Sequence, residues 1–122
     1  MKYTLETLDV YNLAEEFSDK VCTEVMKWKF FEKDTIGKQF VRSIDSIGAN
    51  IAEGFGRYTK KEKIQFYRYA YGSITESIDW AEKASIRKIL NKVQYDHIIQ
   101  ILKSLPRELH HLIKFTNEKL TI

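Results

Sequence analysis

Two groups of side chains in this sequence have the types and spacing to do chemistry. The first lies within residues 57–68 and combines cations with an aromatic ring: Arg57, Tyr58, Lys60, Lys61, Lys63 and Arg68. Phosphates are attracted both to such cations and to the free backbone N–H groups at the start of a helix. This basic cluster therefore predicts a nucleic-acid contact that depends on salt and has little sequence preference. The alternative is an ordinary solvated basic face.

The second group is polar and falls on two successive predicted helices. Its members recur at helical spacing and are Arg42, Ser46, Asn50, Glu53, Ser73 and Glu76. Glu53 and Glu76, facing each other, would resemble half of a di-metal site, but such sites use Glu-x-x-His on two helices, which this sequence does not provide. We interpret the group as a buried or interfacial hydrogen-bond network, in which an arginine–carboxylate pair makes the charge tolerable.

Candidate catalytic and metal-binding groups are few. His110 and His111 are adjacent, so they point about 100° apart on a helix and cannot chelate one metal together. Cys22 has no histidine or asparagine near it in sequence, so we interpret it as a small buried hydrophobe and not a nucleophile. Gly54-Phe55-Gly56 follows no strand and lacks the lysine of a P-loop. The sequence therefore predicts a protein that is not an enzyme and that needs no metal or cofactor.

Four amphipathic helices are expected to position these groups. Apolar residues recur every three or four positions over residues 5–28, 35–56, 60–87 and 91–119. The expected N-terminal caps are Thr4 or Thr7, Asp34 or Thr35, and two capping boxes, Thr59 with Glu62 and Asn91 with Gln94. Pro106 lies inside the last apolar stripe, where it should bend the helix without ending it. Short links between the helices predict an all-α, antiparallel, up-down-up-down four-helix bundle.

Length and composition agree with one folded domain covering residues 1–122, since 43% of the side chains are hydrophobic. No apolar run reaches the roughly 20 residues that span a bilayer, and the N-terminus lacks the pattern of a secretory signal. The single cysteine excludes an intrachain disulfide, so we expect a cytoplasmic protein without a membrane partner. Residues 1–26 carry six acidic side chains against two lysines, opposite in sign to the basic cluster. This separation of acidic and basic segments favours charge-complementary self-assembly or a phosphate-facing patch.

A family resemblance adds to this interpretation. Residues 46–57 read S-I-G-A-N-I-A-E-G-F-G-R, with Arg42 before them, and F-x-x-x-A-x-G-S-x-x-E runs over residues 66–76. Together these blocks resemble the signature of the four-helix-bundle proteins encoded in intervening sequences of 23S ribosomal RNA genes, and the likeness covers nearly the whole chain. Two positions depart from it. Gly48 stands where the family usually has proline, and Asp45 where the family tends to be apolar.

The resemblance implies a bundle that assembles into a homo-oligomer, typically a ring-like pentamer. We therefore expect a non-enzymatic, homo-oligomeric accessory protein linked to ribosomal RNA intervening sequences, which contacts RNA or DNA through the basic cluster. The alternative is an oligomeric scaffold that has no direct nucleic-acid role. Such a scaffold would recruit another protein through the acidic first helix or the ring surface.

Overall fold

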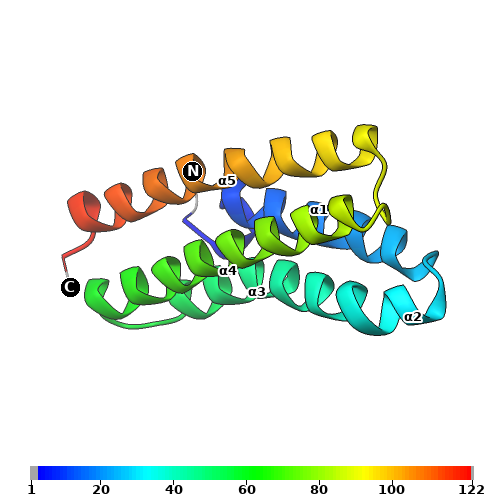
Figure 1. Cartoon of the computed structure of the whole chain (residues 1–122). Coiled ribbons are helices and arrows are strands. Elements are labelled where there is room, and N and C mark those ends of the chain that lie inside the picture. Colours follow the sequence, from blue (N-terminus) through cyan, green and yellow to red (C-terminus); the bar gives the residue numbers. More distant parts are fainter. Residues whose placement is uncertain (1–2, 122) are drawn as a thin grey trace.

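Four helical arms run along one axis in alternating directions (Figure 1). A computed structural model describes residues 3–121, except for the side chain of Glu6. The helices are α1 Asp9–Met26, α2 Phe30–Glu32, α3 Lys38–Phe55, α4 Lys60–Ile86 and α5 Lys92–Lys119. A 3-10 turn, Leu5–Thr7, precedes α1, and a π-helical turn, Lys33–Gly37, joins α2 to α3 as one arm. The predicted all-α four-helix bundle is confirmed, and no strand occurs within residues 3–121.

The core consists of one apolar stripe from each arm. In α3 the apolar residues that recur at helical spacing, Phe40, Ile44, Ile47 and Ile51, are all buried, as are Leu102, Leu105 and Leu109 of α5. The most extensive helix pair is α3 with α4. At its centre the hydroxyl of Ser77 donates to that of Ser43 at 2.9 Å, and both side chains are buried. Small side chains at this contact let the two backbones approach closely.

Two of the expected helix starts, at Thr59 and Asn91, agree with the structure. At α5 the capping box is complete, since the Gln94 N–H donates to Asn91 Oδ1 at 2.8 Å and the Asn91 N–H to Gln94 Oε1 at 2.9 Å. At α4 half of the expected capping box forms: the Glu62 N–H donates to Thr59 Oγ1 at 3.1 Å, while the Glu62 carboxylate accepts from the Thr59 hydroxyl in place of the Thr59 backbone N–H. The expected cap of the first helix is wrong, because Thr4 and Thr7 form a capping box on the 3-10 turn while α1 itself begins after Leu8. The last helix also continues through Pro106 to Lys119, as predicted.

The expected start of the second arm at Asp34 or Thr35 is wrong. The arm begins at Phe30, and the Thr35 hydroxyl donates to the Phe31 carbonyl at 2.7 Å, which places Thr35 inside a helical turn. Ile36 and Gly37 of the π-turn are buried. A Cβ built on Gly37 would lie 2.7 Å from Cγ1 of Val25 on α1, so the arm packs closely there. Packing with α1 thus overrides the local capping signals.

The described part of the chain, residues 3–121, includes no helix that combines the length and the apolar character needed to cross a bilayer.

Candidate functional site

The basic cluster lies at the end of the bundle where α3 stops, α4 starts and α5 finishes (Figure 1). Two of its lysines bind backbone carbonyls there. Lys60 Nζ donates to the Asn117 carbonyl at 3.1 Å, and Lys63 Nζ donates to the Phe55 carbonyl at 2.6 Å. Carbonyls at helix C-termini lack intrahelical donors and carry the negative end of the helix dipole. These two cations therefore stabilise helix ends, and burial lowers the pKa of Lys63.

Arg57 is also engaged within the chain. Its Nη2 lies 2.7 Å from Glu53 Oε1 and its Nη1 3.8 Å from Glu62 Oε2. The guanidinium stands 4.6 Å from the centroid of the Phe66 ring. Two carboxylates and an aromatic face thus hold this cation at the start of α4.

The remaining members of the cluster face solvent. Tyr58 is 66% exposed, and Lys61 and Arg68 are exposed on α4. Seven positions separate Lys61 from Arg68, so both lie on the same face of the helix. Neither has an ion-pair partner among residues 3–121. The structure thus brings the six predicted residues to one end of α4, but leaves only part of their charge available to a ligand.

The predicted polar group behaves differently from a buried network. Ser46 donates to the Arg42 carbonyl at 2.8 Å, and Asn50 to the Ser46 carbonyl at 2.9 Å. On α4, Ser73 donates to the Tyr69 carbonyl at 3.2 Å, and Glu76 accepts from Trp80 Nε1 at 3.0 Å.

Each of these bonds stays on its own helix, and the last member, Glu53, pairs with Arg57 one turn on. No hydrogen bond between two of the six crosses from α3 to α4 in the part of the chain that is described. A buried network in the single chain is therefore wrong. A side-chain hydrogen bond that does cross from α4 to α3 joins Ser77 to Ser43, outside this group of six. An interfacial role for the six, which needs a second chain, stays a prediction.

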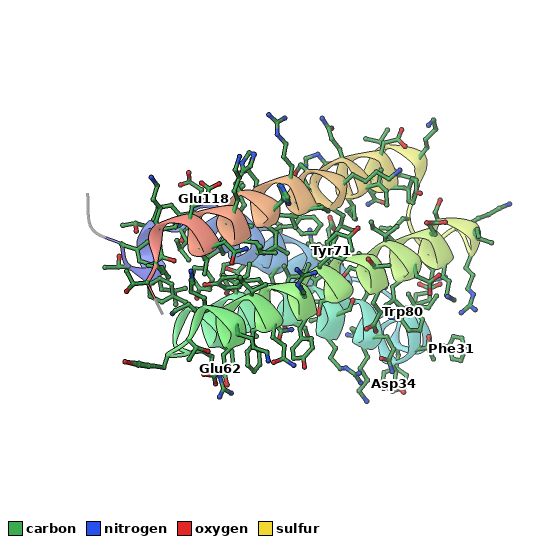
Figure 2. The ribbon with its side chains drawn as sticks, turned by 90° about the vertical axis from the view of Figure 1, so that its left-hand side faces the viewer. Phe31, Asp34, Glu62, Tyr71, Trp80 and Glu118 are labelled. Carbon is green, nitrogen blue, oxygen red and sulfur yellow. The ribbon has the colours of Figure 1, made fainter. Side chains whose placement is uncertain are left out.

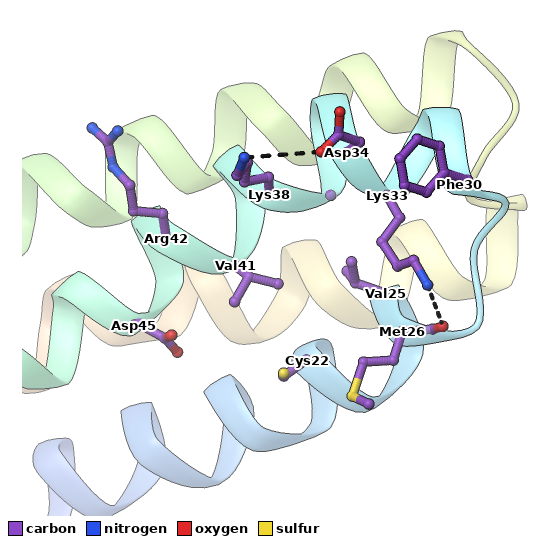
Figure 3. Close-up of a pocket in the computed structure, with 11 residues that line it drawn as sticks. Cys22, Val25, Met26, Phe30, Lys33, Asp34, Lys38, Val41, Arg42 and Asp45 are labelled. Atoms are coloured by element: carbon purple, nitrogen blue, oxygen red, sulfur yellow. Dashed lines mark hydrogen bonds and ion pairs between the residues drawn. The ribbon is translucent and has the colours of Figure 1, made fainter.

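An apolar hollow between α1 and α3 is a feature that sequence reasoning missed (Figure 3). Its volume is about 550 Å³, and its apolar lining includes Cys22, Val25, Met26, Phe30 and Val41. Cys22 is half-buried here instead of fully buried as expected. Charged residues of both signs form the rim: Lys33, Asp34, Lys38, Arg42 and Asp45.

The aromatic corner beside this hollow is unusually exposed. Phe30 is 77% and Phe31 76% exposed, and Met26 at the end of α1 is 67% exposed. Figure 2 shows the Phe31 ring projecting from the end of the bundle. Residues 28–31 (W-K-F-F) supply two phenylalanines that fit no buried stripe, and this was the available sequence signal.

A second hollow lies between α4 and α5 near the basic cluster. Its volume is about 310 Å³, and its lining is Arg68, Tyr71, Pro106, Leu109, His110 and Ile113. The helical period predicts Tyr71 as a member of the apolar stripe of α4. The structure corrects this, because Tyr71 is 54% exposed and lies between the ribbons of α4 and α5 (Figure 2).

Within residues 3–121, no group of three or more histidine, cysteine, aspartate or glutamate side chains is placed to hold a metal ion.

Comparison with known proteins gives a family match and a structural neighbour. The model of the 23S rRNA-intervening sequence protein family matches residues 6–111. A crystal structure of a protein of unknown function from the S23 ribosomal protein family of Bacteroides thetaiotaomicron VPI-5482 is similar in fold, with a TM-score of 0.77 and 24% sequence identity. The similarity covers 86% of this chain and 98% of that one. No curated protein matches the sequence.

Proposed function

We propose, from the premise that this chain belongs to the 23S rRNA-intervening sequence protein family, that it is a non-catalytic, homo-oligomeric bundle that binds RNA as an accessory protein. Self-association is the part for which the geometry offers the most support. The observation that carries it is the exposed corner of Met26, Phe30 and Phe31 beside the hollow between α1 and α3. Exposed apolar surface of this kind, rimmed by polar groups, is typical of interaction sites.

A second copy of the chain is the partner that this surface suits. The rim of the hollow carries Lys33, Lys38 and Arg42 together with Asp34 and Asp45, so both signs of charge are present on one patch. In a ring, each copy presents this face to a different face of the next copy, and a rim with both signs of charge can find opposite charges there, whereas a nucleic acid would meet repulsion from the carboxylates. We propose a closed ring, a pentamer as the family resemblance implies.

Light scattering coupled to gel filtration tests the assembly. The double variant Phe30→Glu with Phe31→Glu should run as a smaller species than the wild type, because two charges would be buried at the interface. Val93→Glu is the matched control, since Val93 is also highly exposed, at 78%, but lies on α5 outside the hollow. Helical circular dichroism checks that both variants are folded. A wild-type chain that is monomeric at all concentrations would overturn the assembly.

RNA binding is supported by the unpaired cations of the basic cluster. Lys61 and Arg68 face solvent without acidic partners among the described residues, and Lys61 lies in the first turn of α4, whose N-terminus favours anions. In a ring this weak patch would repeat, and several copies would act together on one strand.

A salt-dependent titration with labelled RNA tests this part of the proposal. Lys61→Glu with Arg68→Glu should weaken binding strongly and flatten the decrease in affinity between about 50 and 200 mM salt. Lys20→Glu with Arg87→Glu makes the same change of net charge at exposed positions away from the cluster and should bind nearly as the wild type. Lys60 and Lys63 are unsuitable for this test, because each also holds a helix end.

The scaffold alternative differs from the RNA-binding proposal in the RNA affinity that it predicts at low salt. An intact oligomer with negligible RNA affinity even at low salt would favour recruitment of another protein, and would overturn the RNA-binding half of the proposal.

A further inference from the structure

The hollow between α4 and α5, here called the α4–α5 groove, continues from the basic cluster along the bundle. Arg68 belongs to both, since it is a member of the cluster and also lines the groove. Lys60 donates to the carbonyl of Asn117 near the end of α5. This bond joins the start of α4 to the end of α5.

Cations follow the groove on α5. Lys103, Arg107, His110 and Lys114 are spaced by four, three and four residues, which places them on one face of the helix. His110 lines the groove, so this face runs alongside it. Lys103, Arg107 and Lys114 are exposed, and none has an ion-pair partner within residues 3–121.

Acidic side chains are nearly absent from the two segments that form the groove. Residues 63–75 of α4 contain none, and residues 98–117 of α5 contain only Glu108. Glu108 precedes His110 by two positions, so it points about 160° away from that side chain on the helix. The groove therefore presents positive charge without neutralising carboxylates, unlike the corner where Arg57 meets Glu53 and Glu62.

The floor of the groove is aromatic and apolar. Tyr71 is 54% exposed there, beside Pro106, Leu109 and Ile113. An exposed ring in a hollow of about 310 Å³ offers a stacking surface for a planar group of the size of a nucleobase. Arg68 and His110 at its edges are polar groups able to meet the sugar or the phosphate.

We propose that the α4–α5 groove binds single-stranded nucleic acid, with a base stacked on Tyr71 and the backbone phosphates beside Arg68 and the cations of α5. The proposal rests on the RNA binding put forward above and gives that binding a path along the bundle. A single strand is the occupant because the ring can accept only a base that is free of its own stack. A phosphate backbone suits this groove because residues 63–75 and 98–117 contain only one acidic side chain, Glu108, to repel it.

A fluorescence titration with a labelled oligo(U) of about 15 nucleotides, at about 50 mM salt, tests the site. Tyr71→Ala should weaken binding about ten-fold or more, while Tyr71→Phe, which keeps the ring, should bind as the wild type. Tyr69→Ala is the matched control, because Tyr69 is 49% exposed on the same helix but lies outside the groove.

The charged part of the site has its own pair of variants. Arg107→Glu should weaken binding and reduce the slope of log affinity against log salt concentration by about one. Arg87→Glu, just beyond the far end of α4, should change neither the affinity nor the slope. A duplex of the same length should bind more weakly than the single strand.

Each outcome decides between the two proposals. RNA binding that survives Tyr71→Ala and Arg107→Glu would overturn the proposed groove site and leave the general RNA function standing. A loss in Tyr69→Ala equal to that in Tyr71→Ala would have the same consequence. Preference for the duplex would also overturn it. A wild-type protein that binds no oligo(U) at low salt would overturn both.

Discussion

The carboxylate of Glu15 on α1 occupies the space that a side chain at Gly48 on α3 would need. A Cβ built on Gly48 would overlap Oε1 of Glu15 and lie 3.0 Å from its Cδ. Gly48 is buried, and the neighbouring Asp45 of α3 accepts a hydrogen bond from Ser18 of α1. The two positions where this chain departs from the family pattern, 45 and 48, thus meet acidic or hydroxyl groups of α1 at one helix contact.

Glu15→Gln should raise the melting temperature at neutral pH. Burial, followed by the charges of Asp19 and Asp45, raises the pKa of Glu15 above its ordinary value. The folded state therefore binds a proton more readily than the unfolded chain, so stability from this group is present at low pH and is lost as pH rises through the raised pKa. The gain from Glu15→Gln should disappear well below the ordinary glutamate pKa of about 4.3, where Glu15 is protonated in the folded and the unfolded state alike.

Glu16→Gln is the control, because Glu16 is an exposed neighbour with the same charge. Thermal melts of Glu15→Gln and Glu16→Gln at several pH values separate the effect of the site from the effect of net charge. An equal gain from both variants would show that net charge, and not the site between α1 and α3, is responsible.

Gly48→Ala should stabilise the protein although the position is buried. The atom in the way is the tip of a flexible side chain, which can swing toward solvent. Replacing glycine by alanine inside a helix contributes up to about 1 kcal/mol. Urea denaturation of Gly48→Ala, Glu15→Gln and the double variant checks this. The benefit of Glu15→Gln should shrink once alanine has displaced the carboxylate, and full additivity would contradict the contact.

Gly54→Ala should have the opposite effect and lower the free energy of unfolding by about 2 kcal/mol. A Cβ there would lie 2.9 Å from the Lys63 carbonyl and 2.8 Å from the Tyr67 ring. The backbone carbonyl and the buried ring cannot shift away from the new methyl group without disturbing the packing of α3 against α4. Gly72→Ala is the matched control on α4, since nothing lies within 4 Å of its Cβ, and it should gain about 1 kcal/mol. Denaturant midpoints measure both, and a loss at position 72 would contradict the open space described there.

Tyr67→Phe should leave stability unchanged or raise it by about 1 kcal/mol. Tyr67 is fully buried, and its hydroxyl has no hydrogen-bond partner among the described residues. Burial, and next the Tyr3 phenol that approaches without hydrogen-bonding geometry, raise the pKa of Tyr67. Tyr11→Phe, at a half-buried position, is the comparison. A clear loss in Tyr67→Phe alone, measured by thermal melts, would indicate a hydrogen bond to that hydroxyl.

Helix content and most helix boundaries are encoded locally. Apolar residues at Phe40, Ile44, Ile47 and Ile51 share a face because of the helical period, and that face is buried as predicted. The capping residues Thr59 and Asn91 act on backbone N–H groups three positions away, so neighbours along the chain suffice to identify them.

The use made of each polar or aromatic side chain depends on which helices become neighbours. Lys60 and Lys63 read as free cations in sequence, but the ends of α5 and α3 bring carbonyls to them. Tyr71 shares the period of the core residues, yet it lines the hollow between α4 and α5 and is 54% exposed. Phe30 and Phe31 are helical because the π-turn packs against α1, and no local signal encodes that contact. Periodicity gives the direction of a side chain around its own helix, and the packing of distant segments determines what that side chain meets.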